Sequence, residues 1–295
     1  MSGRTALIYA ALFALPEIAT AAPHADVVGT YLLTERAEYF GGFSGLEFGS
    51  DGTRFIALSD SAALINGKVA RDAQGAITDV TFDGPPLRLL GADGAPLPDP
   101  LDDSEGLAQA ADGSLFISFE LVNRIDRYGT DARLSEHLPS PPAFDAFVYN
   151  AGPEALAISA DGVLYTMPEG DAAGARTLPV YRFAAGVWDQ PYTLPEDGTW
   201  RPVGADFGPD GWLYLLERDF WPLLGFQTRV RRFSFAETGE VRQEVLFTST
   251  AGRLGNLEGI AIWQDQARAL HATLISDNNF LAIQDSGFVD LAIRD

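Results

Sequence analysis

One short phrase recurs five times along this chain of 295 residues. It runs from a small or acidic residue through Gly or Ala and a short apolar stretch to a polar turn, a second apolar stretch and a closing acid. The Gly or Ala stands at positions 45, 106, 155, 204 and 259, so neighbouring copies lie 49 to 61 residues apart. A repeat of about 50 residues that is built from short strands is typical of a β-propeller.

Each copy of the phrase predicts a β-hairpin. Asp-Gly pairs at 51–52, 112–113, 161–162 and 210–211 separate the two apolar stretches, and these residues tolerate the positive φ that tight turns require. The segments between copies supply two further strands, so each unit forms a four-stranded blade. The count predicts an all-β propeller of five blades, or of six if one blade has diverged. We expect residues 27–34 to complete the last blade and close the ring, which removes exposed sheet edges.

The same hairpins gather acidic residues at one place. A hairpin reverses direction, so the residue that opens its first strand and the residue that closes its second strand lie at the same end. If the first strand of each blade is innermost, this end surrounds the mouth of the central channel. The acids expected there are Asp60, Glu105, Glu120, Glu154, Glu169, Glu217, Glu258 and Asp277. Like charges at this density require a cation or arginine partners to stay ionised.

Composition excludes several classes of function. The chain carries 41 acidic and 20 basic residues, and a net charge of −21 argues against nucleic acid or an anionic membrane as a partner. The absence of cysteine excludes disulfides, thiolate metal sites and cysteine nucleophiles. The three histidines all lie outside the repeated acidic positions, which argues against a histidine zinc site or a Ser-His-Asp triad.

The N-terminus has the pattern of a secretory signal peptide. Arg4 is followed by an apolar run over 6–15, and Ala19-Thr20-Ala21 supplies small residues for cleavage. We therefore expect residues 1–21 to be a signal peptide and residues 22–295 to form a single propeller domain. The mature protein is expected in the periplasm or the medium, without insertion into a membrane after cleavage.

Longer motifs support a resemblance to a known family. They include Asp103-Ser104-Glu105-Gly106-Leu107, Glu217-Arg218-Asp219-Phe220 and Ser276-Asp277-Asn278-Asn279-Phe280. In this order they resemble the phytase-like family described as having esterase-like activity, over nearly the whole mature chain. The resemblance implies an exported propeller that hydrolyses phosphate or other esters with calcium. Two positions depart from the family pattern, because Ala155 replaces a glycine and Ser61-Ala62 stands where a basic residue is common. The second departure removes a candidate substrate-binding cation.

Calcium is the expected cofactor because it takes six to eight oxygen ligands, which carboxylates around a channel mouth can provide. Glu105, Glu154 and Glu258 are the first predicted ligands, since they open the presumed innermost strands. Asp60 and Asp277, which close their hairpins, are the next. For each acid, the alternative is a structural role in capping a blade edge or pairing with arginine.

The expected substrate is a small ester or phosphoester. Calcium would neutralise phosphate charge and lower the pKa of a water, while a carboxylate outside the metal shell acts as general base. The predicted catalytic residues are Glu105, Glu154, Arg218 and Glu217. Arg218 would bind a phosphate oxygen, or alternatively pair with a neighbouring acid. Two other functions fit the same features: a non-catalytic exported propeller that binds a ligand or protein through this face, and a lactonase-type calcium propeller.

Overall fold

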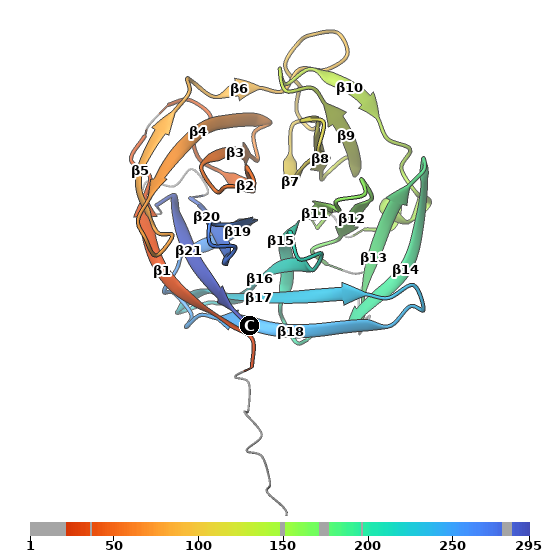
Figure 1. Ribbon diagram of the computed structural model, residues 1–295. Coiled ribbons are helices and arrows are strands. Elements are labelled where there is room, and N and C mark those ends of the chain that lie inside the picture. The colour runs from red at the N-terminus through yellow and green to blue at the C-terminus, as the bar shows by residue number, and fades with distance from the viewer. Residues whose placement is uncertain (1–21, 36, 148–150, 171–176, 196, 279–284) are drawn as a thin grey trace, which may run out of the picture.

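The structure is a computed structural model that describes residues 22–35, 37–147, 151–170, 177–195, 197–278 and 285–295. Five antiparallel sheets stand around a central axis, so the protein is a five-bladed β-propeller (Figure 1). The sequence prediction of the fold and of the number of blades is confirmed. The predicted signal peptide, residues 1–21, lies outside the described residues. Within them, no helix is long and apolar enough to cross a membrane.

The blades follow one another along the chain, and the first strand of each repeated hairpin lies nearest the axis. Blade 1 contains β2 (Phe43–Phe48), β3 (Arg54–Ser59), β4 (Ala63–Arg71), β5 (Ile77–Phe82) and the short β6 (Leu87–Arg88). Blade 2 contains β7 (Ser104–Gln109), β8 (Leu115–Phe119), β9 (Arg124–Tyr128) and β10 (Leu134–His137), which a 3-10 turn (Pro142–Ala146) follows. Blade 3 contains β11 (Ala155–Ile158), β12 (Leu164–Met167), β13 (Thr177–Ala184) and β14 (Val187–Pro195). Blade 4 contains β15 (Arg201–Phe207), β16 (Leu213–Trp221), β17 (Gly225–Phe235) and β18 (Val241–Thr248).

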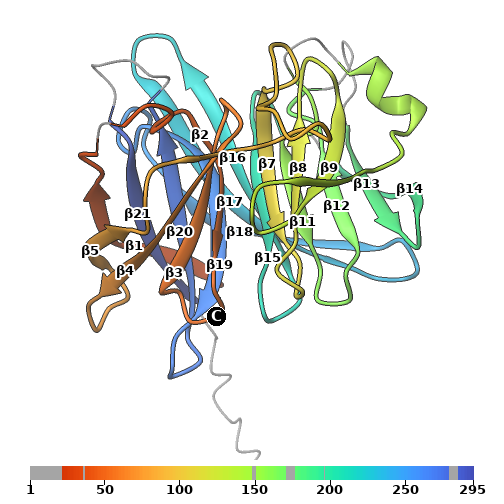
Figure 2. The same cartoon turned by 90° about the horizontal axis from the view of Figure 1, so that it is seen from above.

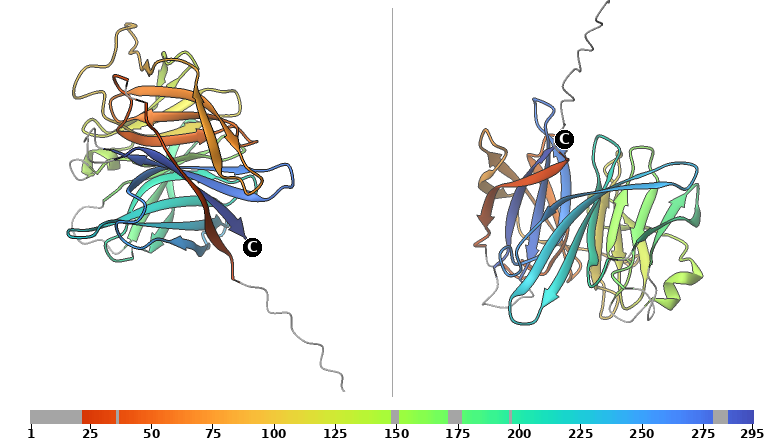
Figure 3. Two further views of the ribbon diagram at one scale, coloured as in Figure 1. Left: turned by 90° about the vertical axis from the view of Figure 1, so that its left-hand side faces the viewer. Right: turned by 90° about the horizontal axis from the view of Figure 1, so that it is seen from below.

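Blade 5 closes the ring with strands from both ends of the chain. Its inner strands are β19 (Asn256–Gln264), β20 (Leu270–Asp277) and β21 (Gly287–Arg294), and its outermost strand is β1 (His24–Leu32). The N-terminal β1 runs antiparallel to β21 from the pair His24–Arg294 to the pair Leu32–Gly287. Figure 3 shows β1, in red, crossing beside the blue strands of this blade. The predicted closure is confirmed, although the strand begins three residues before the predicted segment.

Glycine at the repeated position lets the inner strands of neighbouring blades approach closely. A Cβ atom added to Gly45 would lie 2.7 Å from the Cβ of Leu107 in blade 2, and one added to Gly106 would lie 2.7 Å from the Cβ of Leu156 in blade 3. A Cβ atom on Gly204 would lie 2.6 Å from the carbonyl oxygen of Glu258 in blade 5. The repeat therefore fixes how tightly the blades surround the channel.

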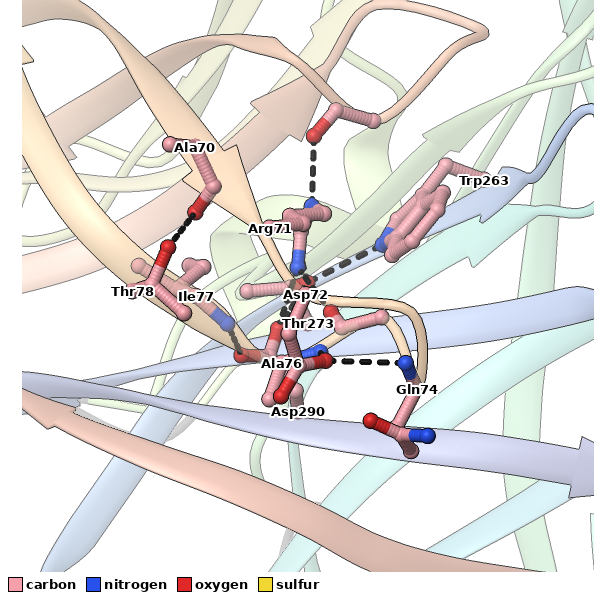
Figure 4. Close-up of polar contacts among 12 residues, drawn as sticks. Ala70, Arg71, Asp72, Gln74, Ala76, Ile77, Thr78, Trp263, Thr273 and Asp290 are labelled. Atoms are coloured by element: carbon pink, nitrogen blue, oxygen red, sulfur yellow. Dashed lines mark hydrogen bonds and ion pairs between the residues drawn. The ribbon is translucent and has the colours of Figure 1, made fainter.

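A buried ion pair ties the first blade to the last (Figure 4). The Arg71 guanidinium, from β4, donates to Asp290 Oδ1 of β21 at 2.7 Å and to Thr273 Oγ1 of β20 at 3.0 Å. The other oxygen of Asp290 accepts the backbone N–H of Ile77 at 2.8 Å. Arg71 also stacks on Trp263, 4.1 Å from the ring centroid. Because only 8% of the Arg71 side chain and 1% of the Asp290 side chain are exposed, this contact is part of the interior at the closure.

Candidate functional site at the channel mouth

The inner strands begin at one end of the channel, and β-bulges lie there. The register of the inner hairpin shifts between Phe43 and Gly45, Ser104 and Leu107, Pro202 and Gly204, and Leu257 and Gly259. A bulge bends its strand and redirects the side chain at that point. Glu105 and Glu258 are such bulge residues, and Glu154 directly precedes β11. Blades 2, 3 and 5 thus each bring one acid to the mouth, whereas blades 1 and 4 have Ser44 and Val203 at this position.

The second strands end at the same place and contribute a second set of acids. The backbone N–H groups of Asp60, Glu120 and Glu169 bond to carbonyls that precede the inner strands, at 2.7, 3.0 and 3.1 Å. Asp277 occupies the corresponding position in blade 5, opposite Asn256. In blade 4, Arg218 takes this position, opposite Arg201. The closing ring therefore consists of four acids and one arginine.

The predicted position of Glu217 at the mouth is wrong. This residue precedes Arg218 on β16, so its side chain points to the other face of the sheet. It is 2% exposed and accepts hydrogen bonds from Arg229 Nε at 2.8 Å and from Arg231 Nε at 2.7 Å. The sequence Glu217-Arg218-Asp219 has an acid on each side of the arginine. The prediction took the acid that lies one residue before the position that faces the mouth.

Three acids of blade 2 form a cluster that could hold a metal ion. Asp103, Glu105 and Glu120 each offer a carboxylate oxygen, and these oxygens all lie within 4.8 Å of one another. Burial raises the pKa of Glu105 well above its usual value, and the charges of Glu154 and Glu120 raise it further. Burial likewise raises the pKa of Glu120 to about 7, with a contribution from Asp103. An oxygen-only set with such unfavourable charge fits a hard cation such as calcium.

Asp103 is the member of this cluster that the sequence does not predict, because it lies outside the repeated phrase. The bulge that follows Asp103 in the chain carries Glu105, and the carboxylates of these two residues lie close together. Burial also raises the pKa of Asp103, and the charge of Asp102 adds to this effect. The available signal was a second acid two residues before Glu105.

Arg218 organises the other side of the mouth. Its guanidinium donates to Glu169 at 2.8 Å, to Asn256 at 3.1 Å and to Glu258. Asn256 in turn donates to Glu258 at 2.8 Å and to Asp277 at 3.3 Å. Among the predicted metal ligands, Glu105 belongs to the blade 2 cluster, whereas Glu258 and Asp277 belong to this arginine network.

Glu154 and Asp60, the remaining predicted ligands, are both acids of perturbed pKa. Burial raises the pKa of Glu154 well above its usual value, and the Glu169 charge raises it further, while the Arg218 charge lowers it. Burial raises the pKa of Asp60 to about 7 against a hydrogen bond from Ser61, and the charges of Asp277 and Asp103 add to the rise. Groups with strongly perturbed pKa values in a cleft are typical of functional sites.

Two cavities open beside this mouth. One has a volume of about 540 Å³ and is lined by charged groups of blades 3 and 4, including Glu169, Arg201 and Arg218. The other has a volume of about 570 Å³ and lies against blades 4 and 5. Both reach Asn256, which contacts the arginine network. Their volumes are in the range of small-molecule sites.

Two solved structures were found to be similar to this chain, and the first of them agrees with the propeller fold. The PQQ-bound aldose sugar dehydrogenase from Streptomyces coelicolor aligns with a TM-score of 0.50 at 13% identity, over 93% of this chain and 99% of that chain. The calcium-binding protein regucalcin from Agrobacterium tumefaciens strain C58 aligns with a TM-score of 0.48 at 12% identity, over 90% of this chain and 95% of that chain. At such identities the likeness concerns the fold alone. None of the curated sequences compared with this chain matches it.

The sequence itself is more informative about the family. Residues 38–280 match the family described as "Phytase-like: Esterase-like activity of phytase". The match covers all five blades except for the closing strands β21 and β1. It also includes both the blade 2 cluster and the arginine network. The chain therefore belongs to the phytase-like family.

Proposed function

We propose that this protein hydrolyses phosphate or other esters at the channel mouth, and that it needs calcium bound by Asp103, Glu105 and Glu120. The observation that carries the proposal is the convergence of three carboxylate oxygens within 4.8 Å of one another. The family's described esterase-like activity supports the reaction class. Calcium bound there would neutralise negative charge on the substrate and lower the pKa of a water molecule.

Glu154 is the proposed general base. Burial is the largest cause that raises its pKa, and a raised pKa makes the ionised carboxylate a stronger acceptor of a proton from water. It also lies outside the three-oxygen cluster, so metal binding by that cluster leaves its oxygens available. Replacing it with glutamine keeps the shape but removes the base.

Arg218 is the proposed donor to a substrate oxygen. Glu169 and Glu258 hold its guanidinium from two sides, which fixes its orientation before substrate binds. The guanidinium also lines the charged cavity. A pre-oriented cation of this kind stabilises charge that develops on an ester or phosphoryl oxygen.

The proposal is tested by removing and restoring calcium. Protein treated with chelator is expected to lose turnover of p-nitrophenyl acetate or p-nitrophenyl phosphate, and to recover it with added calcium. Glu105→Gln should abolish the recovery, and Glu154→Gln should lower turnover at saturating calcium by about 100-fold or more. The matched control is Glu47→Gln, which removes another buried acid of an inner strand, distant from the mouth along β2.

Two outcomes separate the proposal from its rivals. If calcium raises the melting temperature but no ester is hydrolysed, the mouth is a binding site rather than a catalytic one. If Glu47→Gln and Glu105→Gln lose the calcium response equally, the blade 2 cluster is not the metal site.

We also propose that the protein is exported, because of the signal-peptide pattern. N-terminal sequencing of the mature protein should then begin at Ala22.

A further inference from the structure

The hairpin of β16 and β17 carries an unusual apolar tip. These strands have 9 and 11 residues, and their tip rises beyond the neighbouring strands on the face of the mouth (Figure 2). Four large apolar side chains lie exposed there, with 58% of Phe220, 48% of Trp221, 97% of Leu223 and 61% of Leu224 accessible. Large apolar side chains exposed together at one hairpin tip often mark a binding site.

The tip stands between the two cavities beside the mouth. The charged cavity, of about 540 Å³, includes Arg201, Arg218 and Asp219. The apolar cavity, of about 570 Å³, includes Leu32, Leu224 and Phe288. Phe220 and Phe226, whose ring centroids lie 5.0 Å apart, line both cavities and form a wall between them. An extended ligand could therefore place a polar part on one side and an apolar part on the other.

We infer that the substrates are esters with one apolar alkyl or aryl group, which the apolar cavity binds while the ester group lies near Asn256 and Arg218. The inference rests on the proposed function and names its substrate class. Leu32 and Leu224 are 54% and 61% exposed and line the same cavity. Covering such surface with a hydrocarbon group is favourable, by about fourfold in affinity for each buried methylene.

The charges around the cavities disfavour a polyphosphate. Arg201, Arg218 and Arg253 are the lining cations among the residues described, and Arg218 is already paired with Glu169 and Glu258. The acids that line the same cavities are Glu169, Asp219, Asp277 and Asp285. A ligand with several phosphates would need more cations than these arginines and the proposed calcium supply, whereas an ester with at most one anionic group needs a single donor.

Alkylphosphonates test this inference independently of catalysis, because they contain no ester bond to hydrolyse. In the presence of calcium, hexylphosphonate is expected to bind at least tenfold more tightly than methylphosphonate by calorimetry. Leu224→Ser should reduce this ratio severalfold. The matched control is Leu223→Ser, an identical change at the neighbouring residue, which is 97% exposed and lines neither cavity. It should leave the ratio unchanged.

The outcomes distinguish this inference from the proposed function. Equal binding of the two phosphonates, or equal effects of Leu223→Ser and Leu224→Ser, would overturn the apolar site even if esters are hydrolysed. Faster turnover of myo-inositol hexakisphosphate than of p-nitrophenyl hexanoate would also overturn it. Chain-length-dependent binding without turnover of any ester would support the apolar site and overturn the hydrolase.

Discussion

Arg218 is the residue that distinguishes the mouth from a simple ring of acids. It replaces the closing acid of blade 4 and contacts Glu169, Asn256 and Glu258. Its charge also lowers the pKa of Glu154, against the larger effect of burial. One arginine thereby lowers the pKa of the proposed base and holds the side chains that it contacts in place.

This predicts a specific effect of Arg218→Gln on the pH dependence of turnover. Without the positive charge, the pKa of Glu154 rises further, so the base becomes ionised only at higher pH. The acidic limb of the pH–rate profile should shift upward, and turnover at neutral pH should fall. Arg201→Gln, a change at the other arginine of the charged cavity, is the control. An unshifted acidic limb in Arg218→Gln would contradict the assignment of Glu154 as the base.

Glu217 has a structural role that its sequence position conceals. Its two oxygens bind Arg229 and Arg231, and all three side chains are at most 6% exposed. Glu217→Gln leaves two buried arginines without their main counter-charge, so the free energy of unfolding should fall by about 3–5 kcal/mol. Urea denaturation measures the change. Asp189→Asn breaks the exposed pair with Arg182 and should cost less than about 1 kcal/mol.

At the scale of the strand, the repeated glycine is a packing requirement. Gly106 lies where an added Cβ would be 2.7 Å from the Cβ of Leu156 in the next blade. Gly106→Ala should therefore destabilise the protein by about 1–3 kcal/mol through overpacking, as measured by urea denaturation. Gly84→Ala is the control, because no atom lies within 4 Å of its added Cβ. Equal stability of the two variants would contradict the role of glycine in blade packing.

The hairpins were predictable from sequence because their signals are local. Apolar stretches separated by a polar turn recur in every copy, and in four of the five copies that turn contains Asp-Gly, so each hairpin is specified without knowledge of the others. The bulges carry no comparable signal, because an inner strand such as β2 is buried on both faces and its run of residues does not show where the alternation shifts. For this reason Glu105 could be placed at the mouth, whereas the approach of Asp103 to it could not. The same one-residue ambiguity explains why Glu217 is predicted at the mouth although its side chain points to the other face of the sheet.

For the whole molecule, the burial of acidic side chains makes stability depend on pH. Burial is the largest cause that raises the pKa of Asp60, Glu120 and Asp206 to about 7, from values of 3.8 or 4.5 in the unfolded chain. The folded protein therefore holds these protons more tightly than the unfolded chain does. Their stabilising contribution is complete below about pH 4 and is lost as pH rises through about 7.

Thermal denaturation of the metal-free protein checks this dependence. The melting temperature should fall as pH rises from about 5 to 8, and the fall should be smaller in Asp60→Asn, which removes one titrating group. The control is Asp79→Asn, the same change at an exposed acid on the outermost strand of blade 1. It should leave the slope unchanged. If the slope is unchanged in Asp60→Asn, the pH dependence of the melting temperature does not come from Asp60 at the mouth.

The most direct test of a cation at the mouth is the rise in melting temperature on adding calcium, measured at pH 5 and at pH 8. Carboxylates must lose their protons to bind a metal, so the rise should be small at pH 5 and several degrees at pH 8. The rise at pH 8 should disappear in Glu105→Gln and persist in Glu47→Gln. A rise that is absent at pH 8, or that is the same in both variants, would contradict the proposal that calcium binds to Asp103, Glu105 and Glu120.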